Sequence, residues 1–120
     1  MSIFEREEFE AFISGLSCVE IVRQWGDASV GKIGGKIFAI LSVWNDANVH
    51  QISFKCSDMS FEMLPELDGV EKAKYLARAS WVQVAQVSAL NEDDVCAYIV
   101  QAHQLVGDKL PKRVRAELGL

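Results

Sequence analysis

Apolar residues recur at helical spacing near the start of the chain, and this pattern predicts an N-terminal helix. Ser2 and Glu5 have the spacing of a capping box, in which a hydroxyl and a carboxylate bond free amides of the first turn. The apolar stripe that follows consists of Phe9, Phe12, Ile13 and Leu16. A second capping pattern at 17–20 predicts a short helical turn that runs to Trp25, and the glycine and aspartate after it are expected to end that turn.

Two adjacent glycines inside a β-prone stretch predict a hairpin. Gly34 and Gly35 separate the runs 30–33 and 36–44. Two-residue hairpin turns need positive φ angles, which glycine adopts without steric cost. The second run is apolar on both faces, so we expect it to lie centrally in a sheet and to be covered on at least one side. A polar cluster at 45–48 predicts the next turn.

Alternation with a period of two predicts a further strand at 50–56, with one buried and one solvated face. A short helix is expected to start at Ser57 and to end near Pro65, because proline cannot continue a helix. A turn at 68–69 and a strand at 81–87 follow.

A long helix is predicted from Asn91 onward. Asn91 is a favourable N-cap, and the three acidic residues after it suit the positive end of a helix dipole. The core face of this helix is expected to contain Val95, Tyr98, Ile99, Ala102, Leu105 and Val106. Pro111 suits the first turn of a terminal helix and Gly119 its end.

These elements predict one α+β domain over residues 1–120. Consecutive hairpins imply an antiparallel sheet, and the N- and C-terminal helices are expected to pack on one of its faces. The length suits a single core, and a composition that is 50% apolar and 24% charged indicates a folded chain rather than a disordered one.

The charge and hydropathy patterns indicate in which cellular compartment the protein is expected to be found. The N-terminus reaches charged residues by Glu5, so it does not have the pattern of a secretory signal. The longest apolar run, 37–41, is far shorter than the roughly 20 residues that span a bilayer. We therefore expect a cytoplasmic monomer that has no membrane partner.

The reactive side chains give no pattern of catalysis. The three cysteines, Cys18, Cys56 and Cys96, are too widely spaced for a zinc knuckle, and their odd number does not suit a disulfide framework. We therefore expect their thiols to be buried and to pack as small hydrophobic side chains. His50 and His103 have no carboxylate, cysteine or histidine at the i+3 or i+4 position. The sequence also lacks a nucleophile motif, so we expect a protein that is not an enzyme and needs no cofactor.

Four segments, in order, resemble one family. The segments are 34–39 at the glycine hairpin, 52–56, 75–82 and 109–115. Together they are similar to the MmcQ/YjbR family. This resemblance implies a CyaY-like (frataxin-like) α/β sandwich with a double-wing DNA-binding motif.

The chain departs from the pattern of that family at two places. Gly31 stands where the family usually has a bulky apolar residue. Ala79 and Ser80 stand where it often has histidine or arginine before the tryptophan, which leaves Arg78 as the cation of that stretch.

The resemblance and the placement of cations give a first functional hypothesis, which is DNA binding through the hairpin and the C-terminal basic cluster. The candidate residues are Lys32, Gly34, Gly35, Lys36, Lys55, Arg78, Lys112, Arg113 and Arg115. The net charge of −5 argues against binding by bulk electrostatics alone. An ordinary solvated hairpin, in which lysines protect the sheet edge, is the competing interpretation.

The acidic first helix supplies a second hypothesis. Frataxin-like folds use an acidic ridge at this end to bind iron weakly and to dock protein partners. The candidate residues here are Glu5, Glu7, Glu8 and Glu10. Oxygen ligands on an exposed helix suit hard cations at low affinity. A solvated helix face, with acids favouring its N-terminus, explains the same pattern.

Overall fold

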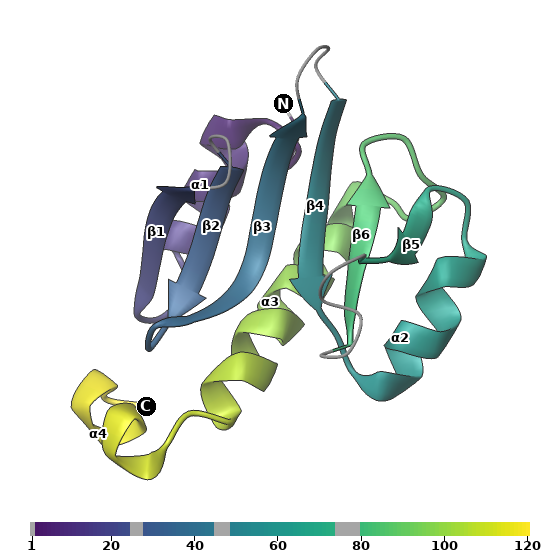
Figure 1. Cartoon of the computed structure of the whole chain (residues 1–120). Coiled ribbons are helices and arrows are strands. Elements are labelled where there is room, and N and C mark those ends of the chain that lie inside the picture. Colours follow the sequence, from purple (N-terminus) through teal and green to yellow (C-terminus); the bar gives the residue numbers. More distant parts are fainter. Residues whose placement is uncertain (1, 25–27, 45–48, 74–79) are drawn as a thin grey trace.

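The computed structural model describes residues 2–24, 28–44, 49–73 and 80–120. Within these ranges the chain forms a six-stranded antiparallel sheet in the order β1-β2-β3-β4-β6-β5 (Figure 1). The elements in chain order are α1 (Arg6–Ser14), β1 (Val19–Gln24), β2 (Ala28–Ile33), β3 (Lys36–Trp44), β4 (Val49–Lys55), α2 (Asp58–Met63), the 3₁₀ helix η2 (Leu64–Glu66), β5 (Val70–Lys72), β6 (Trp81–Ala85), α3 (Glu92–Asp108) and α4 (Lys112–Leu118).

The helices α1 and α3 form a layer on one face of the sheet. α3 lies against β3 and β4, whereas α1 covers β1 and β2 (Figure 1). Buried residues from both helices, such as Phe9 and Ile99, belong to the same core cluster. α2 and η2 lie beside β5 at one edge, and α4 lies beyond one end of the sheet (Figure 1). The predicted α+β fold is thus confirmed.

The glycine hairpin forms as predicted between β2 and β3. Gly34 and Gly35 have φ angles of 58° and 81°, both in the left-handed region. Ile33 and Lys36 close the turn as a cross-strand pair. The turn is thus the two-residue type whose twist matches that of antiparallel strands.

The central strand β3 contains a β-bulge that places two consecutive side chains in the core. Gly31 pairs with Ala39 and Lys32 with Ile37, so Phe38 is an extra residue opposite this register shift. Phe38 and Ala39 are consecutive, yet both belong to the cluster beneath the helices, as a β-bulge permits. Ile37 and Ile40 face a smaller apolar cluster on the other side, which explains why the run is apolar on both faces.

The local signals for the remaining helices also hold. The side chain of Ser57 caps α2, and that of Asn91 accepts a hydrogen bond from the Asp94 amide at 2.8 Å to cap α3. The helix core residues Val95, Ile99, Ala102 and Val106 are buried. Gly119 ends α4 in the left-handed conformation, and Pro111 stands at its N-cap.

The prediction of a helical turn at 17–25 is wrong, because residues 19–24 form the edge strand β1. Val19 and Ile21 pack toward the core, as alternation along a strand allows. All six residues pair with β2, from Val19 opposite Ile33 to Gln24 opposite Ala28. This non-local ladder outweighs the local capping pattern.

Three other details differ from the sequence-based expectations. The Ser2 hydroxyl and the Glu5 carboxylate accept hydrogen bonds from the amides of Phe4 and Ser2, as the capping box predicts, but they cap a turn before α1, which begins at Arg6 with Glu5 at its N-cap. The short strand β5 was not predicted. The polar face of β4 is not fully solvated, since Ser53 is buried opposite Ile40. The predicted turn at 45–48 lies outside the described residues.

Substitutions at Gly31 test how tightly the side chains beneath α1 are packed. A Cβ atom at this position would lie 2.9 Å from Cδ1 of Ile13 and 3.1 Å from Cζ of Phe38. We expect Gly31→Leu to lower the free energy of unfolding by about 1–3 kcal/mol through overpacking, and Gly31→Ala by less than about 1 kcal/mol, because the end of Ile13 can shift. Urea denaturation measures both, and a Leu variant as stable as the native chain would contradict this packing.

Candidate nucleic-acid interface

The hairpin lysines differ in their surroundings. Lys36 is exposed beside the turn. Lys32 is half-buried on β2, where it stands across from Glu20 of β1 and Ile37 of β3. The Lys32 charge is therefore partly offset by a carboxylate on the neighbouring strand, and Lys36 is the more available cation of the pair.

The tip of the hairpin packs against the C-terminal helices. A Cβ atom at Gly34 would lie 2.7 Å from Cδ1 of Leu110 and 3.2 Å from Cγ1 of Val114. Leu110 is buried, and Val114 belongs to α4. This contact brings the basic residues of α4 to the same end of the sheet as the turn.

Lys55 joins this group from the end of β4. Burial lowers the pKa of Lys55, and the nearby positive charge of Lys109 lowers it further, against the opposing effect of Asp58. The pKa shift therefore indicates that Lys55 and Lys109 are close neighbours. Lys109 is the C-cap residue of α3, so β2, β3, β4 and the two C-terminal helices all contribute cations here.

We call this region the basic end. It is defined by Lys32, Lys36, Lys55, Lys109, Lys112, Arg113 and Arg115. Acidic residues also occur there: Glu20, Asp58, Asp108 and Glu117. Cations thus outnumber acids at this end of a chain that is acidic overall.

The seven cations are not equivalent. Lys36, Lys109, Lys112 and Arg113 are exposed. Arg115 is half-buried, and among the described residues its buried Nε has no hydrogen-bond partner. Arg115 therefore belongs more to the packing of α4 than to the accessible surface. Arg78 lies outside the described residues.

Sequence reasoning did not select Lys109 as a candidate. Its only local signal is its place as the first residue of the terminal motif at 109–115. Its proximity to Lys55 depends on where α3 ends relative to β4, which is a tertiary property.

The acidic residues gather toward the opposite end. The N-terminal segment is joined to the start of α3 by a hydrogen bond from the Ile3 amide to the Glu92 carboxylate, and this bond lowers the pKa of Glu92. The exposed acids Glu5, Glu7, Asp93 and Asp94 lie in these two segments. α3 therefore runs from an acidic region to the basic end.

Glu10 does not belong to an exposed acidic ridge. Its carboxylate accepts a hydrogen bond of 2.7 Å from the hydroxyl of the buried Ser29 and pairs with Arg23 at 3.4 Å. The Ser29 hydrogen bond is the largest cause of its lowered pKa. Within the described ranges, no group of three His, Cys, Asp or Glu side chains is arranged to hold a metal ion.

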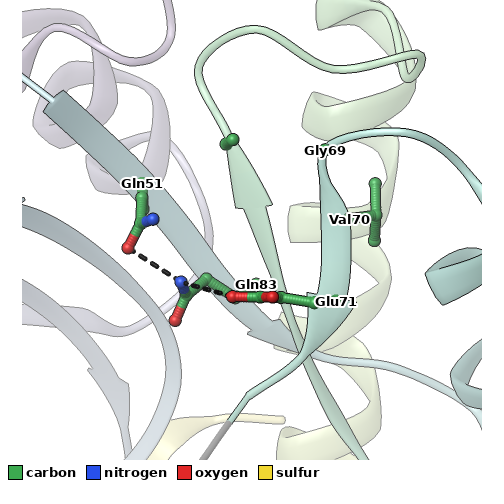
Figure 2. A pocket seen from close by; sticks show the side chains of 6 residues that line it. Gln51, Gly69, Val70, Glu71 and Gln83 are labelled. Carbon is green, nitrogen blue, oxygen red and sulfur yellow. Dashed lines mark hydrogen bonds between the residues drawn. The ribbon is translucent and has the colours of Figure 1, made fainter.

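A shallow pocket lies elsewhere, on the sheet surface over β4, β5 and β6 (Figure 2). The Gln83 amide donates to Gln51 at 2.8 Å and to Glu71 at 3.4 Å, so one glutamine bridges three strands. Gly69, Val70 and Ala85 complete the lining. Cross-strand registers create this ladder, and no local sequence signal indicates it.

The three cysteines differ in their burial, and His103 packs against an aromatic ring. Cys56 is buried, which raises its thiol pKa to about 11, and Cys96 is half-buried. Cys18 is exposed, contrary to the expectation of a buried thiol, because it lies at the bend before β1 with a φ of 59°. His103 contacts the Phe38 ring edge-on at 5.3 Å.

The comparisons with known proteins assign the chain to a family. The family model described as YjbR matches residues 14–105, so this chain belongs to the YjbR family. No curated protein matches the chain. In the described part of the chain, no helix is both long and apolar enough to cross a membrane.

Two crystal structures are similar to this fold. Protein DR2400 of Deinococcus radiodurans, described with the domain DUF419, has a TM-score of 0.79 at 20% identity and covers 95% of this chain and 87% of its own. A protein from Pseudomonas syringae has a TM-score of 0.69 at 18% identity and covers 84% of this chain and 97% of its own.

The two turn glycines provide a matched test of the contact between the hairpin and the C-terminal helices. Both have positive φ angles, but a Cβ at Gly35 would meet nothing within 4 Å. We expect Gly35→Ala to cost about 1–2 kcal/mol from backbone strain, and Gly34→Ala to cost more because it also displaces Leu110. Urea denaturation and the methyl NMR shifts of Leu110 and Val114 measure this, and equal effects of the two variants would refute the contact.

The Glu10 carboxylate gives a pH-dependent prediction. A pKa below its ordinary value of 4.5 stabilises the fold above that value, and the stabilisation is lost as the pH falls through the lowered pKa. We expect Glu10→Gln to lower the free energy of unfolding at pH 7 and to have a smaller effect near pH 3. Chemical denaturation at both pH values tests this, with exposed Glu7→Gln as the control. A Glu10→Gln effect that is the same at both pH values would contradict it.

Proposed function

We propose that this protein is a non-enzymatic binding protein whose basic end contacts the phosphate backbone of DNA. The observation that carries the proposal is the packing of Gly34 against Leu110 and Val114. Because of this contact, the exposed Lys36 of the hairpin and the exposed cations of α4 lie at one end of the sheet.

The proximity of the positive charges of Lys55 and Lys109 also supports the basic end as the phosphate-binding surface. Burial lowers the pKa of Lys55, the positive charge of Lys109 lowers it further, and Asp58 opposes this effect. A bound anion would relieve that repulsion, since an opposite charge nearby favours the protonated amine. Phosphate oxygens carry such a charge and accept hydrogen bonds from ammonium groups.

The size of the surface limits the kind of binding. About four exposed cations can neutralise only a few phosphates, so affinity is expected to be modest and strongly dependent on salt. Exposed lysine and arginine side chains contact phosphate oxygens without reading sequence, so contact with the backbone is the proposed mode. The acidic first helix has less support as a metal site, because Glu10 is bonded to Ser29 and Arg23.

Fluorescence anisotropy with a labelled DNA duplex over a salt series tests this proposal. We expect binding at low salt, and we expect Lys32→Ala combined with Lys36→Ala to weaken it and to reduce the salt slope by about 1–2. Lys36→Ala alone is compared with Lys72→Ala, which removes an exposed lysine from β5, three strands away from β3 in the sheet.

Two results would refute the proposal. One is the absence of binding at low salt, and the other is an equal effect of Lys36→Ala and Lys72→Ala. An NMR titration locates the surface independently, since DNA should shift resonances at 32–36 and 109–115 and leave those of residues 5–10 unchanged.

A further inference from the structure

Most of the exposed large apolar side chains among the described residues lie along the edge of the sheet beside β5. Met59, Met63, Leu67 and Val87 expose 72%, 58%, 37% and 88% of their surfaces. Among the described residues, the other exposed large apolar side chains are Val100 and Leu120. We call the group Met59, Met63, Leu67 and Val87 the methionine edge.

The exposure of the two methionines follows from the orientation of α2. Met59 and Met63 are one helical turn apart and share a face. The other face carries Phe61, which packs against the core, and leads to the buried Leu64 at the start of η2. The core contacts of α2 therefore do not require either methionine.

Backbone hydrogen bonds place Val87 close to the end of this stripe. The loop after β6 is joined to the turn that follows Leu67, because the Ala85 amide donates to the Gly69 carbonyl and the Ala89 amide to the Asp68 carbonyl, both at 2.8 Å. The methionine edge is thus a continuous margin built from α2, η2 and this loop, beside β5 (Figure 1).

The rim of the methionine edge is acidic. Residues 57–71 contain no lysine or arginine, and their five acidic residues are all exposed: Asp58, Glu62, Glu66, Asp68 and Glu71. The following cation, Lys72, has its Nζ 4.6 Å from the centre of the Phe61 ring. Asp58 and Glu62 are one turn apart on α2, so their carboxylates line one side of the methionine stripe.

We infer that the methionine edge docks a basic amphipathic helix of a partner protein. Methionine side chains are flexible and polarizable, so they adapt to an apolar helix face. Two anchors one helical turn apart suit recognition of a helix, and the carboxylates of the rim complement lysine or arginine on its flanks. The same carboxylates disfavour an anionic ligand, so this surface and the basic end select opposite charges.

The test uses the full chain and a synthetic amphipathic peptide of leucine and lysine at helical spacing. The control peptide has glutamate in place of lysine. We expect the basic peptide to bind, to shift NMR resonances of residues 58–72 and 85–89, and to leave the basic end unchanged. We expect the acidic peptide not to bind.

Single substitutions separate this surface from general attraction to an acidic protein. Met59→Ser or Met63→Ser is expected to weaken binding of the basic peptide about tenfold, whereas Val100→Ser, at an apolar residue on α3 that is 41% exposed, leaves the affinity unchanged. Thermal unfolding verifies that each variant is folded. Shifts at residues 5–10 in place of α2, equal weakening by Val100→Ser, or no binding of the basic peptide would each overturn the inference.

Discussion

The absence of a side chain at Gly31 is the constraint on which the helical layer depends. Ile13 of α1 and Phe38 of the bulged strand β3 occupy the space above this residue. Phe38 in turn contacts the ring of His103 on α3, and Nε2 of His103 lies 2.7 Å from the carbonyl oxygen of Ser17, between α1 and β1. The missing side chain at Gly31 of β2 therefore leaves the space in which side chains of α1, α3 and β3 pack together.

The packing around Gly31 also involves α3, and this helix extends to the far end of the sheet. α3 is fixed against β3 and β4, and its last residues lead directly to Leu110 beside the hairpin. The cations of β4, the hairpin and the two C-terminal helices thus come together through apolar packing, not through mutual attraction. At the other margin, α2 uses one face for the core and presents the opposite face outward. The protein therefore offers two chemically different surfaces on one small scaffold.

The elements that were predicted correctly have local causes. The glycine turn and the caps Ser57 and Asn91 depend on residues a few positions apart, so the sequence alone indicates them. β1 was mistaken for a helical turn, because its structure depends on pairing with β2 rather than on its own capping pattern. β5 has three residues, too few to show a period. For the candidate site, the hairpin lysines were visible in the sequence, but the proximity of Lys109 to Lys55 depends on tertiary packing.

Charge is separated along α3, with acids around Glu92 and cations beyond Asp108, and this separation contributes an electric dipole to the molecule. In the field of a polyanion, such a molecule experiences a torque as well as the repulsion expected from its net charge of −5. The torque turns the end that contains Lys36 and Lys112 toward the field source before any contact forms. The orientation of approach, rather than the total charge, then determines which encounters are productive.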